Sequence, residues 1–340
     1  MKAAVVSRYG PPEVLEIRDV PAPVPADDEV LVRVHASTVC YGDRVVRQGP
    51  LLVRLMGGLR RPKAAILGAD LSGTVVSVGK NVTRFAPGNQ VFGSRGEKFG
   101  GYAEFACVSQ DGFLAKKPST MTLDQAATMF VGGVCSLYFL RKARIQPGER
   151  VLVHGASGSL GTFAVQLAKH YGAHVTGVCG TSNVDLVTSL GADDVIDYRR
   201  EDFTRDGKAY DVICDVMGKA GFPRSLRALK PGGRYLLVGL SGGMLAIAAA
   251  MLRGVLAHVT GRAVFMAGPA VPVQADLEFL RALAERGELR SVIGRTYGLH
   301  DIVEAHRHAD TDRKVGNTVV LMPAESARNA ASATGSGIPA

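Results

Sequence analysis

Residues 150–161 read RVLVHGASGSLG, and the rest of the chain is organised around this stretch. Residues 151–154 are a short apolar run rich in β-branched side chains, which is typical of a strand buried on both faces. Three glycines follow at three-residue spacing, and residues 162–171 then place apolar side chains at helical intervals. This order of strand, glycine turn and helix predicts a site where a pyrophosphate binds the N–H groups at a helix N-terminus.

A second strand is expected at residues 174–179, after the helix. Gly180 then occupies roughly the position where an acidic residue would bind a ribose 2′-hydroxyl. No carboxylate stands there to repel a 2′-phosphate, so the sequence favours NADP over NAD. Polar and basic residues that suit a phosphate lie nearby, namely Thr181, Ser182, Arg199 and Arg200.

Length and composition describe a soluble protein of about two domains. The chain has 340 residues, of which 46% are apolar and 21% are charged. Its start, MKAAVVSRYG, lacks the apolar core of a signal peptide, and the longest apolar stretch, residues 244–259, is too short to span a bilayer. We therefore expect a cytoplasmic protein with no transmembrane segment.

The net charge limits the possible binding partners, and the spacing of the cysteines limits the possible crosslinks and metal sites. A net charge of +9 suits an anionic partner, but the basic residues are dispersed and no nucleic-acid-binding module accompanies them. A non-enzymatic role, crystallin-like or in nucleic-acid binding, stays open as an alternative that only this charge supports. The five cysteines include no C-x-x-C pair, so neither a disulfide framework nor a zinc ribbon is indicated.

The order of the expected strands and helices along the chain predicts a doubly wound α/β domain inserted in a β-rich domain. Residues 1–122 read as short strands with Pro and Gly punctuation, and residues 123–270 alternate strands with helices. Residues 271–323, with helices expected at 276–286 and 301–308, should return to the β-rich domain. Residues 324–340 are small and polar, and we expect a disordered tail there.

Several motifs in order resemble the medium-chain dehydrogenase/reductase superfamily, in particular its zinc-independent quinone oxidoreductase and enone reductase branch. They are LGADLSG at 67–73, TRFAPG at 83–88, GYAEF at 101–105, the glycine turn, LGADDVIDY at 190–198, DVICDVMG at 211–218 and KPGGRYLLVG at 230–239. The resemblance implies a GroES-like barrel as the catalytic domain, a Rossmann domain inserted in it, hydride transfer with NAD(P)H, and commonly a homodimer.

The resemblance also raises the question of zinc. Metal-dependent members place a catalytic cysteine in a context like VCYGD at residues 39–43, which makes Cys40 the candidate ligand. The histidine of the second position is replaced by Ala69, and the third ligand would fall near Gly132. A catalytic zinc needs three protein ligands, so no metal site is predicted, and Cys40 is better read as a small residue beside the cofactor.

The absence of a Lewis acid favours a conjugated substrate. Reduction of an isolated ketone places full negative charge on one oxygen, whereas a quinone or an α,β-unsaturated carbonyl spreads the charge over its π system. We therefore expect an NADPH-dependent quinone or enone reductase. A metal-free NADP-dependent alcohol or ketone oxidoreductase is the enzymatic alternative.

The catalytic candidates are Tyr41 and Asp43. Tyr41 can serve as proton donor or oxyanion partner, or equally as an aromatic wall of the pocket. Asp43 is the second candidate, although its loop position suits backbone hydrogen bonds better than acid–base work. Relatives usually carry N-P-x-D where this chain has Cys40 to Asp43, and often threonine at Cys135, so their substrate preference does not transfer.

The expected cofactor contacts follow the order of the nucleotide. Ser157, Gly158, Ser159 and Leu160 should meet the pyrophosphate. Gly180, Ser182 and Tyr198 should meet the adenosine phosphate end, and Val216, Gly239 and Leu240 the ribose and nicotinamide. Tyr198 and Asn317 are carried over by the resemblance, and Phe265 is expected at the nicotinamide side or at a dimer interface.

Overall fold

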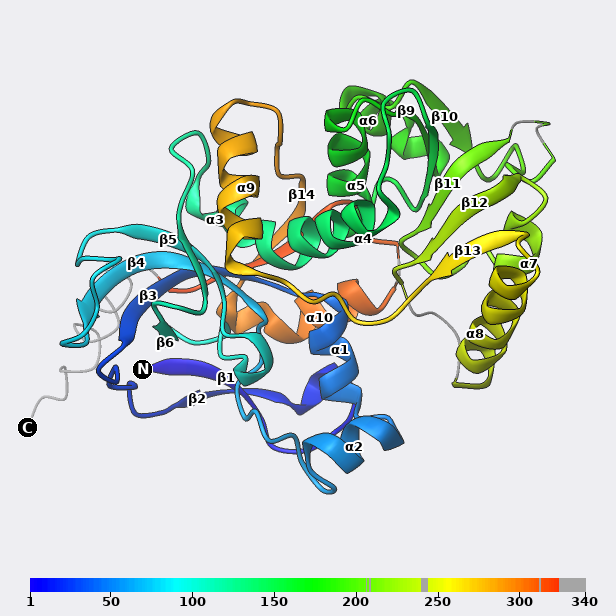
Figure 1. Cartoon of the computed structure of the whole chain (residues 1–340). Coiled ribbons are helices and arrows are strands. Elements are labelled where there is room, and N and C mark those ends of the chain that lie inside the picture. The colour runs from blue at the N-terminus through cyan, green and yellow to red at the C-terminus, as the bar shows by residue number, and fades with distance from the viewer. Residues whose placement is uncertain (206, 208, 240–243, 312, 324–340) are drawn as a thin grey trace, which may run out of the picture. The chain divides into compact units, whose positions relative to one another are not determined.

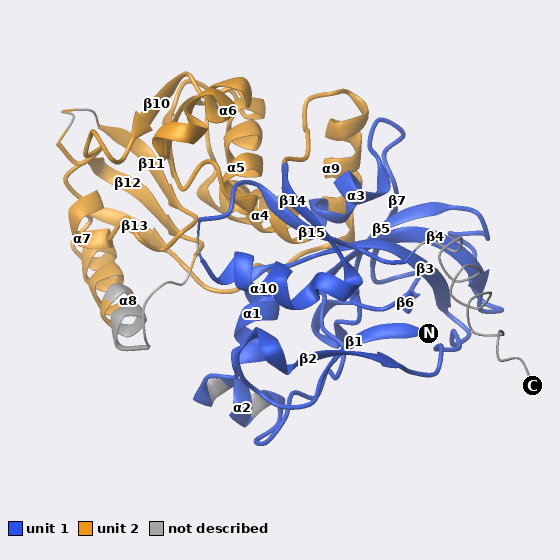
Figure 2. Ribbon diagram, turned by 180° about the vertical axis from the view of Figure 1, so that it is seen from behind, with its two compact units in different colours: residues 1–130, 293–340 blue, residues 131–292 orange. Residues whose placement is uncertain are grey.

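The structure is a computed structural model that describes residues 1–323 except 206, 208, 240–243 and 312. Its chain divides into two compact units, coloured separately in Figure 2. Unit 1 contains residues 1–130 and the chain from residue 293 onward, and unit 2 contains residues 131–292.

Unit 1 is the β-rich part (Figure 1). Its main sheet has the order β14-β15-β3-β4-β5-β7, with β6 also paired to β3, and β1 and β2 form a separate antiparallel pair. The strands are β1 (Lys2–Val6), β2 (Leu15–Asp19), β3 (Glu29–Thr38), β4 (Asp70–Val78), β5 (Gln90–Ser94), β6 (Phe105–Ser109), β7 (Phe113–Lys116), β14 (Ile293–Gly298) and β15 (Asn317–Leu321). The α-helices among the described residues of this unit are α1 (Tyr41–Gln48), α2 (Leu51–Gly57), α3 (Leu123–Ala127) and α10 (Ile302–Asp310).

The core of unit 1 follows from alternation along its strands. Val30, Val32 and Val34 of β3 are at most 3% exposed, and they belong to one apolar cluster with residues of the neighbouring strands. Thr122 caps α3, because its hydroxyl accepts the N–H of Gln125 while the Gln125 side chain accepts the N–H of Thr122.

Unit 2 is built on a six-stranded parallel sheet with the order β10-β9-β8-β11-β12-β13. Its strands are β8 (Arg150–His154), β9 (His174–Cys179), β10 (Asp194–Asp197), β11 (Tyr210–Asp215), β12 (Leu229–Leu237) and β13 (Ala263–Met266). Its helices are α4 (Cys135–Ala143), α5 (Ser159–His170), α6 (Val184–Ser189), α7 (Phe222–Ser225), α8 (Met244–Val259) and α9 (Gln274–Glu285). The expected doubly wound sheet is confirmed.

The strand order of the unit 2 sheet indicates where a ligand would bind. The chain runs outward from β8 to β9 and β10 on one side, then returns to β11, β12 and β13 on the other. The carboxyl ends of β8 and β11 therefore flank a topological switch point, where open α/β sheets bind their ligands. Leu152 of β8 packs on the side of the sheet that also holds Phe222 of α7 and Ala257 of α8.

Two local expectations differ from the structure. The sequence predicts a helix at residues 221–229, which ends before Pro231 and Gly232. The structure has only a short helix at Phe222–Ser225, because β12 already begins at Leu229 and runs through Pro231 and Gly232. The helix at 276–286 was expected in the β-rich domain, but α9 lies in unit 2. There Asp276 pairs with Arg141 of α4, and Leu280 lies against Gly133.

Two further expectations fall outside the described residues, namely the tail at 324–340 and the position of Leu240. In the part of the chain that the structure describes, no helix has the length and apolarity to cross a membrane.

Candidate functional site

The N-terminus of α5 is the centre of the candidate cofactor site. β8 ends at His154, residues 155–158 turn, and α5 begins at Ser159 with Gly158 as its N-cap. Gly158 offers no capping side chain, and the first turn of α5 has no acidic residue. The first N–H groups of a helix have no partner within the helix, and they carry its positive dipole end. This end of α5 is therefore suited to an anion.

The glycines of the turn serve different purposes. Gly155 has φ +88°, a conformation that favours glycine, and a Cβ on Gly161 would overlap the carbonyl oxygen of Gly155. Gly161 thus allows the turn to pack on the helix. At Gly158 a Cβ would meet nothing closer than that same carbonyl oxygen, at 3.5 Å. Among the described residues, a small side chain at Gly158 would therefore meet no clash.

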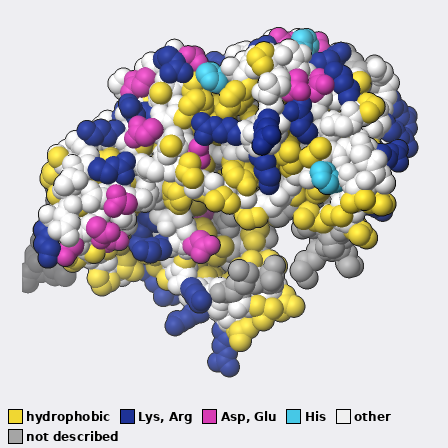
Figure 3. All heavy atoms as spheres, in the orientation of Figure 1, with side chains coloured by type: hydrophobic (Ala, Val, Ile, Leu, Met, Phe, Trp, Pro, Cys, Tyr) yellow, Lys and Arg dark blue, Asp and Glu magenta, His cyan; other side chains and the backbone are white. Residues whose placement is uncertain are grey.

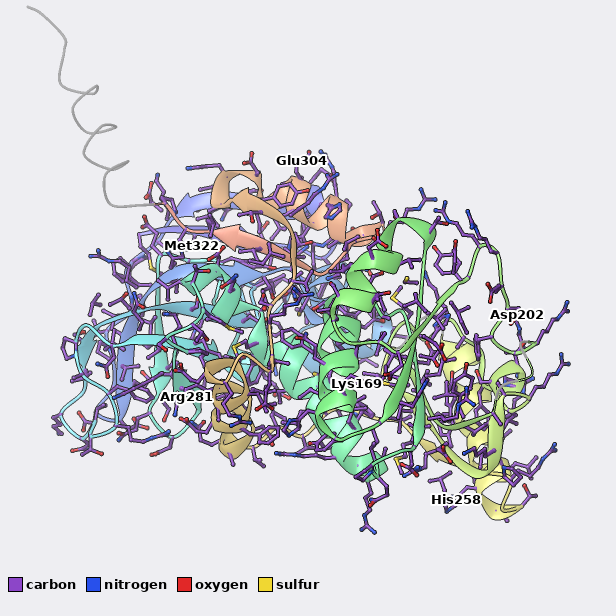
Figure 4. The ribbon with its side chains drawn as sticks, turned by 90° about the horizontal axis from the view of Figure 1, so that it is seen from above. Lys169, Asp202, His258, Arg281, Glu304 and Met322 are labelled. Atoms are coloured by element: carbon purple, nitrogen blue, oxygen red, sulfur yellow. The ribbon has the colours of Figure 1, made fainter. Side chains whose placement is uncertain are left out.

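The far end of α5 is held to the sheet. Lys169 lies in the last turn of α5 (Figure 4), and its ammonium donates to both oxygens of Asp193 at 2.8 Å. Asp193 also accepts the N–H of Val175 in β9 at 2.7 Å. These bonds fix the position of α5 along the sheet, and with it the position of the helix N-terminus.

The expected adenosine end lies at the carboxyl end of β9. A Cβ on Gly180 would lie 3.4 Å from the Tyr198 hydroxyl, so the structure brings these two residues together. Tyr198 is 57% exposed, and Ser182 is exposed as well. The amide of Asn183 donates to the Ser157 hydroxyl at 3.2 Å, which joins this end to the glycine turn. Sequence reasoning did not identify Asn183.

A carboxylate that the sequence analysis did not consider also lies at this end. Asp197, the last residue of β10, accepts the Thr181 hydroxyl at 2.6 Å. This bond, together with the backbone N–H of Arg199 and nearby positive charge, lowers the pKa of Asp197. Arg200 lies 3.6 Å from the same carboxylate. Part of the positive charge expected for a 2′-phosphate is therefore shared with Asp197.

At the switch point, a buried carboxylate organises the loop after β11. Asp215 accepts the Tyr235 hydroxyl at 2.8 Å and the N–H of Ala220 at 2.9 Å, and its other oxygen lies 3.1 Å from Nδ1 of His154. Burial raises the pKa of Asp215, but the hydrogen bonds and the neighbouring His154 outweigh it and lower the pKa overall. The motif DVICDVMG was recognised, but its position alone did not reveal this role for Asp215.

The nicotinamide candidates Val216, Gly239 and Phe265 all lie in unit 2. Gly239 donates its N–H to the backbone carbonyl oxygen of Asp215 at 3.2 Å, and a Cβ on Gly239 would overlap the carbonyl oxygen of Val216. Gly239 and Val216 therefore lie together at the carboxyl ends of β12 and β11. The ring of Phe265 is stacked on Tyr235, with centroids 5.9 Å apart, and is edge-on to Phe222. Phe265 is thus part of the aromatic packing of unit 2 itself.

In unit 1, Asp43 is tied to backbone groups. It is fully buried, and its two oxygens accept the N–H groups of Cys40 and Gly68, each at 2.9 Å. Burial is the largest influence on the carboxyl and raises its pKa. These bonds are those that a positioning role requires, and they join the start of α1 to the chain before β4.

Tyr41 differs from Asp43 in its exposure. It is the first residue of α1 and is 51% exposed, with the guanidinium carbon of Arg44 6.0 Å from its ring centroid. The Cys40 thiol beside it is buried, and burial together with Asp43 and Asp70 raises its pKa well above the usual value. Asn317 is buried at the start of β15.

Among the residues that the structure describes, no three His, Cys, Asp or Glu side chains form a group suited to a metal ion.

Comparisons with known proteins agree with this geometry. One family model, described as an alcohol dehydrogenase GroES-like domain, matches residues 26–119, and another, described as a zinc-binding dehydrogenase, matches residues 190–320. The human quinone oxidoreductase is 32% identical over 318 residues, covering 91% of this chain and 93% of the relative. A trans-enoyl reductase of Aspergillus terreus is 31% identical over 315 residues, covering 86% of each chain.

Solved structures lead to the same family. A quinone oxidoreductase from Coxiella burnetii superposes with a TM-score of 0.83 at 28% identity, covering 95% of this chain and 99% of that one. An NAD-dependent alcohol dehydrogenase gives a TM-score of 0.81 at 26% identity, covering 95% and 100%. The chain belongs to the medium-chain dehydrogenase/reductase superfamily, and it is an oxidoreductase whose family implies a nicotinamide cofactor. Within the superfamily its relatives include quinone oxidoreductases and trans-enoyl reductases.

Proposed function

We propose that this protein is an NADPH-dependent, zinc-free reductase of quinones or of the activated C=C bond of α,β-unsaturated carbonyls. The observation that carries the proposal is the N-terminus of α5, whose N-cap residue is Gly158 and whose first turn contains no acidic side chain. The bound cofactor supplies a hydride. The residues of unit 2 hold it in our proposal, with Ser157, Gly158, Ser159 and Leu160 at the pyrophosphate and Val216 and Gly239 toward the nicotinamide.

NADPH is preferred to NADH in this proposal because of the groups around Gly180. A glycine at this position places no negative charge beside a 2′-phosphate, and the exposed side chains of Ser182 and Tyr198 offer hydroxyl groups. Arg199 and Arg200 are both exposed. The negative charge of Asp197 would repel a 2′-phosphate and so favours NADH. This repulsion is weakened, because the Asp197 carboxylate accepts the Thr181 hydroxyl and lies near the guanidinium of Arg200.

Independence from zinc is supported by the side chains at the expected ligand positions. Ala69 offers no ligand atom. At Gly132 even a Cβ would come within 2.8 Å of the Phe163 ring, so a cysteine does not fit there without movement. A substrate that delocalises its negative charge has no need of a Lewis acid.

In the proposed reaction, Tyr41 donates a hydrogen bond or a proton to the substrate oxygen. It is exposed enough to reach a ligand, and solvent can replenish its proton. Asp43 acts through position, because its two backbone bonds hold the turn from which α1 and Tyr41 start.

A metal-free alcohol or ketone oxidoreductase is the second candidate, favoured by the likeness to an alcohol dehydrogenase structure. Matched substrate pairs separate the two. The purified protein is mixed with NADPH and with enones, their saturated ketone counterparts and quinones, and the loss of NADPH absorbance is followed. Turnover of enones or quinones but not of saturated ketones supports the proposal. Turnover of a saturated ketone without its enone supports the second candidate, and no turnover on a broad panel contradicts both.

We also propose that the protein is cytoplasmic and a homodimer that pairs through α8. This helix exposes Leu252, Val255, Leu256 and Val259 by 59% or more, which makes one apolar face. A dimer that becomes monomeric in Leu256→Asp during sedimentation supports this interface, whereas a wild-type monomer contradicts it.

A further inference from the structure

A basic surface with exposed leucines lies on unit 1, around α2 and the loop that follows it. From Leu51 to Ala69 the sequence contains four Arg or Lys residues, Arg54, Arg60, Arg61 and Lys63, and no Asp or Glu. Figure 3 shows basic and apolar side chains together at the bottom of the view, where Figure 1 labels α2. None of these residues belongs to the cofactor site described above.

The basic side chains surround a pocket. Its volume is about 520 Å³, and it is lined by the end of β1, by Arg18 of β2 and by the loop 58–63. Arg18 is paired with Glu16 at 2.6 Å. Three further cations, Arg60, Arg61 and Lys63, are exposed at the pocket and have no carboxylate partner among the described residues. The pocket is therefore complementary to an anion.

Leucines lie beside these cations at a spacing of four residues. Leu51 and Leu55 of α2 and Leu59 of the following loop are 64%, 63% and 67% exposed. Side chains four residues apart share one face of a helix. Leucines so exposed at the edge of a basic pocket indicate a surface for a partner that presents apolar groups and negative charge side by side.

The shape of this surface is fixed by contacts within unit 1. Gly58 ends α2 with φ +114°, and its carbonyl oxygen accepts the Tyr9 hydroxyl at 2.6 Å. The guanidinium of Arg54 lies 4.9 Å over the Tyr9 ring and donates to the carbonyl of Gly49. Val6 donates to the carbonyl of Ala65 at 2.7 Å, which ties the end of the loop to β1. The pocket is thus held open by the fold.

We propose that this surface docks on a membrane rich in anionic phospholipid, with a lipid phosphate in the pocket and the leucines inserted between the headgroups. A second copy of the chain is disfavoured, because a symmetric contact would place like charges together. Nucleic acid would satisfy the cations but not three exposed leucines. Under the proposed function, docking would bring the enzyme to lipid-dissolved quinones, but the docking itself does not depend on that function.

Vesicle co-sedimentation of the full chain tests the proposal. The vesicles are phosphatidylcholine alone or with phosphatidylserine, at low and at physiological salt. We expect binding only to the anionic vesicles, weaker at higher salt. Each cation near an anionic surface contributes about fivefold to binding, so Arg60→Gln/Arg61→Gln/Lys63→Gln should lose on the order of 100-fold. The control Lys80→Gln/Lys98→Gln/Lys116→Gln removes the same charge from other exposed positions of unit 1 and should bind much as the wild type does.

A second variant tests the leucines. Leu55→Ser/Leu59→Ser keeps every charge and should also lose most vesicle binding, while NADPH binding and thermal unfolding show that it is folded. The proposal is overturned if the wild type does not bind anionic vesicles, or if the leucine variant binds them as the wild type does. It is also overturned if the control triple variant loses as much vesicle binding as Arg60→Gln/Arg61→Gln/Lys63→Gln. Binding of inorganic phosphate or of RNA without vesicle binding also overturns it.

Discussion

The carboxylate of Asp43 accepts the backbone N–H of Gly68 at 2.9 Å, across a gap of 25 residues in the sequence. Its other oxygen accepts the N–H of Cys40, so one buried side chain holds both the start of α1 and the chain before β4. The residue that sequence reasoning named as a catalytic candidate is thereby a clamp between two segments of unit 1.

Replacement of Asp43 by Asn should destabilise unit 1. An amide can accept only one of the two N–H groups and turns its own NH₂ toward the other, which costs about 1–3 kcal/mol for a buried unsatisfied donor. Denaturant unfolding measures the loss. The control is Asp27→Asn, since Asp27 is 60% exposed in a surface pair with Lys80 and should change stability little. Equal stability of Asp43→Asn and the wild type would refute the clamp.

His306 should make the protein sensitive to mild acid. It is fully buried, and burial together with the positive charges of Arg47, Arg44 and Lys314 lowers its pKa to about 3. The unfolded chain binds a proton below the ordinary histidine pKa of about 6.5, so the stability falls as the pH drops from there toward 3. Between pH 7 and 5 this single group should cost about 2 kcal/mol.

The check on His306 is its replacement by leucine. The free energy of unfolding is measured at neutral pH and at pH 5 for both proteins. His306→Leu should lose about 2 kcal/mol less than the wild type over this interval, whatever its stability at neutral pH. Parallel losses would show that His306 does not carry the acid sensitivity.

Gly180→Asp should shift the cofactor preference from NADPH toward NADH. The nearest atom to a Cβ at this position is the Tyr198 hydroxyl at 3.4 Å, so the side chain fits, and its charge repels a 2′-phosphate while it can bind a ribose hydroxyl. We expect the ratio of kcat/KM for the two cofactors to change by about tenfold or more, or 1.4 kcal/mol. Thr188→Asp adds the same charge at an exposed position of α6, and an equal shift in that variant would contradict the assignment.

Tyr41→Phe should lower kcat by about a hundredfold if the hydroxyl donates to the substrate. The side chain is 51% exposed, so thermal unfolding should stay unchanged. A kcat within twofold of the wild type would assign Tyr41 to the wall of the pocket, the alternative that the sequence left open.

The sequence predicted the elements whose neighbours in space are also near in sequence. The strand β8, the glycine turn and α5 follow directly from an apolar run, three glycines and a helical period. The placement of α9 did not follow, because it depends on Asp276 meeting Arg141, and no local pattern relates two residues so far apart. β14 was missed because most of its side chains are exposed, which leaves no alternation to read.

The candidate site divides in the same way. Glycines at fixed spacing reveal the pyrophosphate end, since only a backbone without side chains satisfies that turn. The roles of Asp197 and Asp215 could not be predicted from the sequence, because each depends on partners from another segment. Asp197 accepts the Thr181 hydroxyl, and Asp215 contacts Tyr235 and His154.

The most direct test is a titration of NADPH into the wild-type protein and into Gly158→Asp. No atom of the described residues lies nearer than 3.5 Å to the new Cβ, but the side chain places a carboxylate where the pyrophosphate should bind. We predict saturable binding of NADPH by the wild type and its loss in a folded Gly158→Asp. Failure of the wild type to bind NADPH, or undiminished binding by Gly158→Asp, would contradict the cofactor site at the N-terminus of α5.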